Sequence, residues 1–309
     1  FHLHVLETED DVNQNIPITY DLSKIRSSRL RGQSDDKILE EFGSRVSVFE
    51  LSGVINFIGS NFITRSVAEE DFKDFIVLSF MRVSRLTRAS IEVFKLFFDQ
   101  ILSKSQRVIV VDREVVKDNP KGLFEEMADL IKENCQCFKN LDQAIEWTEG
   151  QLIAEHGVCQ NNSEDFSTLA EQPILKGLPK SDLETLQNNM TLTEYESGSK
   201  IIQLNEKADG IYFLRSGKVS VMVGDDIYVS GLDAGTCFGE LALIAPDATR
   251  TANIIAETKV FCSFLSITAF NEISLVNPKF NELLLRNLGL ILFERLKQSN
   301  SKIIALSAN

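Results

Sequence analysis

The sequence lacks the features that would place it in several large classes of protein. No apolar run approaches the roughly 20 residues that a membrane-spanning helix needs, and no signal peptide opens the chain. Lysine and arginine number 32 against 45 acidic residues, which gives a net charge of -13. A general nucleic-acid surface is excluded because phosphate binding needs concentrated cations. We expect a cytoplasmic protein without direct membrane insertion and, because Phe1 is not an initiator methionine, part of a longer one.

Cysteine and histidine are also scarce. The five cysteines lack the paired spacing of a zinc site and fit a reducing cytoplasm better than a disulfide framework. His2 and His4 share one face of a short predicted strand, with no cysteine or carboxylate motif nearby. We therefore expect no metal site, and we do not expect the chain as given to be an enzyme.

The first half of the chain alternates between short apolar runs and helical patterns. The apolar runs lie at 46–51, 75–80 and 107–111, and the helical patterns at 59–69, 90–102, 120–133 and 141–155. Such alternation is typical of an α/β domain with a mixed sheet covered by helices. We assign this domain to residues 43–156. Residues 1–42 are expected to end a preceding domain and to continue as a basic linker.

The second half has a different pattern. After a polar linker at 157–171, short strands alternate with glycines every eight to twelve residues, which predicts a small antiparallel β-roll with flanking helices at 172–309. The chain closes in a long helix with Asn277 as N-cap and Pro278 at its first position. The apolar stripe of this helix consists of Phe280, Leu283, Leu284, Leu288, Ile291 and Leu292.

One segment of the second half has the composition of a phosphate site. Residues 235–244 combine a glycine-rich turn with a short apolar helix, and Arg250 follows before a strand. A turn that opens a helix directs backbone N–H groups at phosphate oxygens. The planar guanidinium of Arg250 matches the geometry of the phosphate. Glu240 would accept a hydrogen bond from a ribose hydroxyl, close enough to Arg250 to reduce the cost of burying either charge.

This segment resembles the phosphate-binding cassette of the cyclic-nucleotide-binding family, which includes catabolite activator proteins, cyclic-nucleotide-dependent kinases and gated channels. The likeness spans about residues 173–300. Within that range, residues 206–214 and 216–219 also resemble the family. It implies cAMP or cGMP as a regulatory ligand, with ribose contact from Glu240 and phosphate contact from Arg250. The expected site residues are Phe238, Gly239, Glu240, Leu241, Ala242, Arg250, Thr251 and Ala252.

Two questions about the ligand stay open. Thr251 can bond the phosphate and, in cGMP-selective members of the family, also the guanine amino group, which favours cGMP weakly. A degenerate member would keep the fold and act as a scaffold without ligand. The presence of both Glu240 and Arg250 argues against that alternative, because a buried arginine without its phosphate is costly.

The first half resembles a STAS domain, the fold of sulfate-transporter tails and anti-sigma-factor antagonists. The resemblance rests on 46–55, 75–90 and 141–149. Antagonists receive a phosphate on an Asp-Ser-Ser stretch, whereas Thr87, Arg88 and Ala89 stand at the matching positions here, so a phosphorylation switch is not expected. Thr87 or Ser90 could substitute, although a hydroxyl at a helix start is usually a cap.

A STAS domain followed by a cyclic-nucleotide domain is similar to the C-terminal region of long bacterial glutaminases. The alternative parent is a SulP-type anion transporter, whose upstream sequence would contain membrane spans. We expect a regulatory module whose catalytic domain lies before Phe1, and a homo-oligomer that forms through the C-terminal helix. A transcription factor is disfavoured, because only a short tail remains after that helix for a helix-turn-helix.

Overall fold

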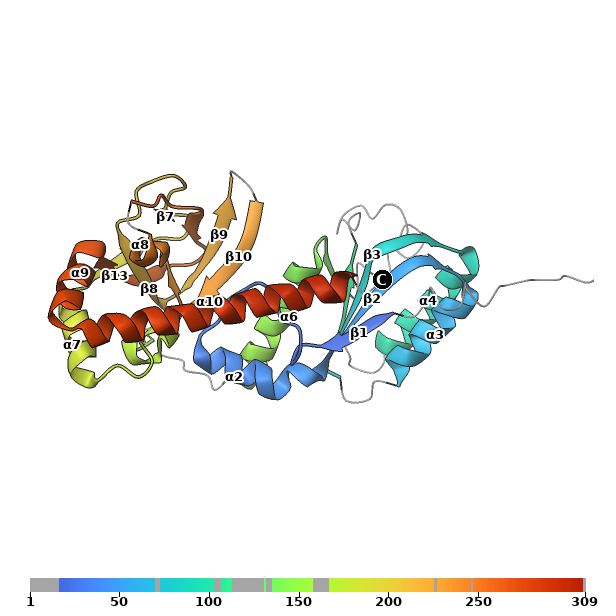
Figure 1. Cartoon of the computed structure of the whole chain (residues 1–309). Coiled ribbons are helices and arrows are strands. Elements are labelled where there is room, and N and C mark those ends of the chain that lie inside the picture. The colour runs from blue at the N-terminus through green and yellow to red at the C-terminus, as the bar shows by residue number, and fades with distance from the viewer. Residues whose placement is uncertain are drawn as a thin grey trace, which may run out of the picture. The chain divides into compact units, whose positions relative to one another are not determined.

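The computed structural model describes residues 17–69, 73–102, 107–112, 131, 135–157, 167–224, 227–245 and 247–307 (Figure 1). The chain divides into two compact units. The first unit comprises residues 1–27 and 38–157, and the second comprises 28–37 and 158–309. This division differs from the expected preceding domain and linker at 1–42, because the described residues 17–27 and 38–42 belong to the first unit and residues 28–37 belong to the second. The expected boundaries at 43, 157 and 172 stay a prediction.

A mixed five-stranded sheet organises the first unit, in the order β1-β2-β3-β4-β5. β1 pairs antiparallel with β2, and the remaining neighbours pair in parallel. The strands are β1 Ile18–Asp21, β2 Val46–Ile55, β3 Phe75–Leu86, β4 Arg107–Val111 and β5 Gln136–Phe138. The three predicted apolar runs lie in β2, β3 and β4, where both faces of the strands are buried, as expected for a parallel sheet.

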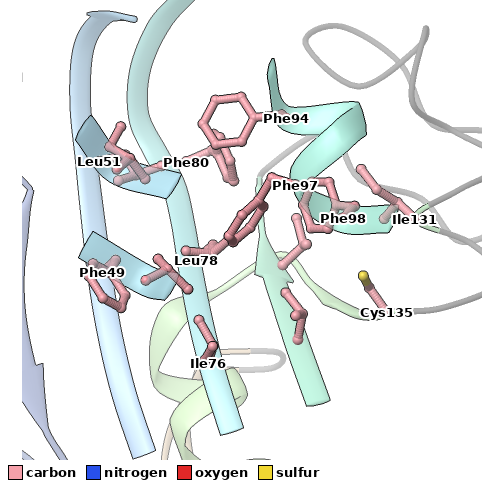
Figure 2. Close-up of a cluster of buried hydrophobic side chains, with 14 of the residues drawn as sticks. Phe49, Leu51, Ile76, Leu78, Phe80, Phe94, Phe97, Phe98, Ile131 and Cys135 are labelled. Atoms are coloured by element: carbon pink, nitrogen blue, oxygen red, sulfur yellow. The ribbon is translucent and has the colours of Figure 1, made fainter. Parts of the chain in front are cut away.

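Helices cover both faces of this sheet. On one face, α3 Phe57–Ala68 and α4 Arg88–Leu102 pack on a cluster that includes Phe49 and Phe80 (Figure 2). On the other face, Leu39 of α2 (Gln33–Phe42) and α6 Leu141–His156 pack on a cluster that includes Val48. Successive residues of β2 thus face opposite clusters, as the period of two of a strand requires.

Thr87 and Ser90, the two hydroxyls weighed as phosphate acceptors, have structural roles at the start of α4. The hydroxyl of Thr87 accepts a hydrogen bond from the Ser90 amide at 3.3 Å, as an N-cap does. The hydroxyl of Ser90 donates to the Thr87 carbonyl at 2.7 Å, and Ser90 is fully buried. The expected strand with His2 and His4 lies outside the described residues, as does most of the predicted helix 120–133.

Two four-stranded antiparallel sheets form the β-roll of the second unit, as predicted. Their orders are β10-β9-β12-β7 and β11-β8-β13-β6. The strands are β6 Thr191–Tyr195, β7 Lys200–Ile202, β8 Gly210–Ser216, β9 Lys218–Val223, β10 Ile227–Asp233, β11 Cys237–Phe238, β12 Asn253–Ala256 and β13 Val260–Ser266. β10 lies at one edge of its sheet.

Helices flank the roll on its N-terminal and C-terminal sides. They are η3 Leu169–Glu171, η4 Pro173–Leu175, α7 Lys180–Asn188, α9 Ile267–Val276 and α10 Pro278–Ser307. Asn277 is the N-cap of α10, because its side-chain oxygen accepts from the Phe280 amide at 3.2 Å. All six residues of the predicted apolar stripe belong to the core of this unit or pack against it. Among the described helices, none combines the length and apolar character that crossing a bilayer requires.

Candidate functional site

The turn between β11 and β12 contains the predicted cassette. β11 ends at Phe238, Gly239 adopts φ +78°, and Glu240 precedes the short helix α8 Leu241–Ile244. A Cβ at position 239 would lie 2.6 Å from Nη1 of Arg250 and 3.2 Å from the Gly210 carbonyl oxygen. Glycine is required here for its backbone conformation and for the close approach of the arginine.

Arg250 is the buried cation of this site, with a residue exposure of 6%. Its Nη1 donates to the Gly239 carbonyl at 3.1 Å, and its Nη2 donates to the Gly210 carbonyl at 2.9 Å. Nη2 also forms an ion pair with Oδ1 of Asp209 at 2.6 Å. The Asp209 side chain is 62% exposed, so the only carboxylate paired with Arg250 among the described residues comes from the surface.

Backbone hydrogen bonds fix the position of Arg250. Its amide donates to the Glu206 carbonyl at 2.7 Å, and its carbonyl accepts from the Asn205 amide at 2.9 Å. Three residues on, the side chain of Asn253 accepts from the Leu204 amide at 2.8 Å and donates to the Gly224 carbonyl at 3.1 Å. The strand that follows Arg250 is thereby tied to two separate loops of the roll.

Two aromatic rings lie beside the guanidinium. Tyr212 of β8 stacks on Phe238 with centroids 5.1 Å apart, and the Cζ atom of Arg250 lies 5.8 Å from the Tyr212 centroid. Burial raises the pKa of Tyr212 well above its usual value, so its hydroxyl stays protonated. Phe238 therefore has a packing role in the structure.

Glu240 does not pair with Arg250, which corrects the expected arrangement. Its Oε1 accepts a hydrogen bond from Nη1 of Arg295 on α10, at 3.1 Å. The physical reason is that Arg250 points toward Gly239 and Asp209, so a second arginine neutralises the carboxylate. Nε of Arg295 is buried and has no hydrogen-bond partner in the described part of the chain.

The remaining predicted site residues surround this arrangement. The Ala242 amide donates to the Gly239 carbonyl at 3.2 Å within the turn. Leu241 and Thr251 are exposed, and Ala252 is half-buried. Their ligand contacts stay a prediction. In the described chain, no group of three His, Cys, Asp or Glu side chains could hold a metal ion.

Cys237 lies inside the core next to the cassette. Burial raises the pKa of its thiol to about 12, which suppresses the reactive thiolate. Cys135, Cys137 and Cys262 are likewise free thiols, whereas Cys159 lies outside the described residues.

Sequence reasoning missed Asp209, Tyr212 and Arg295. A signal was available for Arg295, because it follows the core residue Leu288 by seven positions and therefore lies on the same helix face. No comparable signal marks Asp209, a single acidic residue before a strand. Its role depends on the pairing of distant strands.

Three Ser-x-x-Lys spacings, which some amidohydrolases use for catalysis, occur in the sequence, and the structure describes the side chains of two of them, Ser34–Lys37 and Ser197–Lys200. The Ser197 hydroxyl donates to the Glu257 carbonyl at 2.8 Å rather than to a lysine. Ser34 and Lys37 are both exposed on α2. Neither spacing forms a buried nucleophile and base.

Comparison with known proteins identifies a known domain in the second unit. Residues 192–276 match the family model of the cyclic nucleotide-binding domain. This chain therefore contains a cyclic nucleotide-binding domain, and its roll and flanking helices have that fold.

Curated relatives extend the comparison beyond the roll. Over its whole length the chain is 30% identical to Glutaminase 1 and 29% identical to Glutaminase 2 of Bradyrhizobium diazoefficiens, and each alignment covers 49% of the relative. A third of the chain is 34% identical to 28% of the cAMP-dependent protein kinase type II regulatory subunit of Drosophila melanogaster. The chain spans about half the length of the glutaminases it matches.

Proposed function

We propose that the second unit binds a cyclic nucleotide at residues 238–252 and thereby regulates the protein to which the chain belongs. One observation carries this proposal: Arg250 is buried, yet its paired carboxylate comes from the exposed side chain of Asp209. A guanidinium held in a dry site by two glycine carbonyls is poised to receive an anion. The match to the family model over 192–276 supports this assignment.

The charges of the site support the following position for the ligand. Its cyclic phosphate replaces Asp209 at Nη2 of Arg250 and accepts from the amides of Gly239, Leu241 and Ala242 at the start of α8. Glu240 accepts from the ribose hydroxyl. A phosphate of one negative charge substitutes for one carboxylate, so the buried arginine keeps a counter-ion throughout.

The nucleotide is cAMP or cGMP. Two relatives bear names that refer to cAMP, the fly kinase regulatory subunit and the cAMP-activated global transcriptional regulator of Escherichia coli, which is 29% identical over 42% of this chain. These names favour cAMP. Thr251 is exposed beside the cassette and favours cGMP, because its hydroxyl can reach a guanine amino group. Direct competition between the two nucleotides decides the question.

The attached protein is a glutaminase, and the chain is its C-terminal regulatory region. The alignment to two glutaminases over the whole chain supports this parent over an anion transporter. In this proposal the first unit is a STAS-like domain, the hydrolysis of glutamine takes place in a domain upstream of Phe1, and the protein is cytoplasmic. A scaffold that binds no nucleotide is the remaining alternative.

Regulation passes through α10. Arg295 joins this helix to Glu240, so a ligand that changes the position of Glu240 also changes the packing of the helix. Coupling of this kind is typically about 1 to 3 kcal/mol.

The exposed apolar residues Leu290, Phe293 and Leu296 recur on α10 at intervals of three and form the surface through which two chains associate.

Calorimetric titration of the 309-residue chain with cAMP and with cGMP tests the proposal. Arg250→Ala should abolish binding, while Arg286→Ala, which removes an exposed arginine from α10, should leave it unchanged. Thermal unfolding of each variant establishes that the fold persists. Equal affinity in wild type and Arg250→Ala would refute the assigned site, and absence of binding to wild type at millimolar nucleotide would favour the scaffold.

A further inference from the structure

A segment far from the roll in sequence lies along the open edge of β10. The Leu30 amide donates to the Gly231 carbonyl at 2.8 Å, and the Asp233 amide donates to the Leu30 carbonyl at 2.9 Å. Leu30 and Leu232 are thereby paired in parallel. Because β10 is an edge strand, its free backbone groups are available to such an added segment. We call residues 28–32 the arginine segment.

Two arginines of this segment are buried against carboxylates of the roll. Nη1 of Arg29 lies 2.6 Å from Asp233 Oδ1, and Nη2 donates to both carboxylate oxygens of Glu257 at 2.8 Å. Nη1 of Arg31 lies 3.0 Å from the other oxygen of Asp233. The arginine side chains are 5% and 2% exposed, so both charges have left water. A solvated linker keeps its charged side chains in water, because a buried charge needs a partner that offsets the cost of its desolvation.

Glycines allow this close approach. A Cβ at Gly231 would lie 2.2 Å from Cζ of Arg29, and a Cβ at Gly32 would lie 2.5 Å from the Ala234 carbonyl oxygen. Gly235 has φ +88°, and its Cβ would lie 3.1 Å from Cα of Gly32. The close packing of the arginine segment therefore extends from Gly231 in β10 to Gly235, the first residue of the segment 235–244.

The contacts end at the turn that opens the phosphate-binding segment. Asp233, which receives both arginines, also accepts through its carbonyl from the Thr236 hydroxyl at 2.7 Å. The Gly235 amide donates to the Leu214 carbonyl at 2.9 Å, which anchors the turn to β8. Displacing the arginine segment would leave the buried carboxylate of Asp233, the first residue of this turn, unpaired.

We propose that Arg29 and Arg31 are positioning residues for the cassette, and that the arginine segment orders the turn at Asp233–Thr236 through the Asp233 carboxylate. The segment is then part of the nucleotide-binding unit, and any displacement of it weakens the ligand site. The effect on ligand affinity rests on the function proposed above, whereas the effect on the turn does not.

Hydrogen exchange of single amides, measured by NMR on the 309-residue chain, tests the proposal without ligand. Gly231→Ala is the informative variant, because its methyl group displaces the guanidinium of Arg29 and removes no charge. Exchange at Leu30, Asp233 and Gly235 should accelerate roughly 100-fold, the scale expected for a broken buried pair. The Phe213 amide in the central strand β8 should not change. Val229→Ala, at an exposed position of the same strand, is the matched control.

Arg29→Lys and Arg29→Ala separate positioning from folding. Lysine keeps the charge but lacks the planar fork that contacts two carboxylates, so it should restore only part of the protection at Gly235. Acceleration at Leu30 and Phe213 alike would indicate general loss of stability and overturn the proposal. Acceleration at Leu30 with none at Gly235 would overturn it too, because the turn would then be independent of the segment.

Nucleotide titration adds a second readout. Gly231→Ala should lower the affinity for cAMP or cGMP about 5- to 150-fold, and by reciprocity the nucleotide should slow exchange at Leu30 in the wild type. Arg250→Ala should abolish the effect of nucleotide and leave the protection at Leu30 intact. If the wild type binds neither nucleotide, the function proposed above fails while the exchange at Gly235 still decides this inference.

Discussion

The carboxylate of Glu240 is held by Arg295, a residue of the C-terminal helix, at 3.1 Å. Both side chains are largely shielded from water, at 15% and 29% exposure, so the pair is stronger than an ion pair on the open surface. Glu240 thus connects the cassette to α10, and the residues that precede the cassette contact the arginine segment on β10.

Arg295→Ala should weaken the binding of the nucleotide about tenfold, a value within the usual range of coupling between sites. The reason is that Glu240 loses the partner that orients it as an acceptor. Calorimetry measures the change, with Arg286→Ala on the exposed side of the same helix as the control. An unchanged affinity would mean that Arg295 acts on packing alone.

Asp209→Asn should raise the affinity for the nucleotide and lower the stability of the free protein. In the free protein Asp209 occupies the Nη2 atom of Arg250 that we assign to the phosphate, so removing its charge removes a competitor. Loss of an ion pair to a buried arginine should cost about 1 to 3 kcal/mol of unfolding free energy. Urea unfolding and calorimetry check the two effects, and Asp247→Asn, at an exposed position, is the control. Weaker binding would show that Asp209 assists the ligand instead.

Alkaline pH should destabilise the protein. Burial raises the pKa of Cys135, Cys237 and Cys262 from 9.0 to about 12. Between these values the unfolded chain releases protons that the folded chain retains, so stability is full below pH 9 and falls as the pH rises toward 12. The slope is up to about 1.4 kcal/mol per pH unit for each thiol.

Urea midpoints at pH 8, 9.5 and 11 measure this dependence. Cys262→Ala should reduce the slope, because it removes one of the titrating groups. The tyrosines Tyr20 and Tyr212, whose pKa values burial also raises, should preserve part of the slope in that variant. A midpoint that does not change with pH would contradict the prediction.

Phe293→Glu should reduce self-association of the chain. Phe293 is 60% exposed on α10, near the similarly exposed Leu290 and Leu296. A charge in the centre of an apolar interface is desolvated without a partner and should dissociate a dimer. Light scattering after size-exclusion chromatography measures the mass, and Glu294→Gln is the control. A monomeric wild type would exclude this surface as the site of assembly.

Elements with a strong apolar pattern could be predicted from the sequence. β4 and α10 begin where their patterns begin, because their buried positions are apolar except for Asn287 and the N-cap of α10 is explicit. β3 continues to Leu86, six residues past the predicted apolar run. The extension contains arginines and serine, and its strand conformation comes from pairing with the end of β2, which no local pattern encodes.

The site was predictable where a local motif carries it. Gly239 and Arg250, both named from the sequence as site residues, lie in contact because they belong to one short segment. The partners of the charged groups could not be predicted. Asp209 and Arg295 reach the cassette through tertiary structure, and a basic stretch such as Arg29 to Arg31 has the composition of a solvated linker. Its burial depends on Asp233, about two hundred positions away.

The second unit has a consequence for synthesis on the ribosome. Its residues 28–37 emerge before the whole of 38–157, so its first piece is made on the order of ten seconds before its last at ordinary elongation rates. During that interval Arg29 and Arg31, which are buried in the folded unit, remain hydrated. The second unit therefore becomes complete only after the first unit has been translated, and a chain that stops at residue 157 would contain the whole first unit but leave residues 28–37 without their partners.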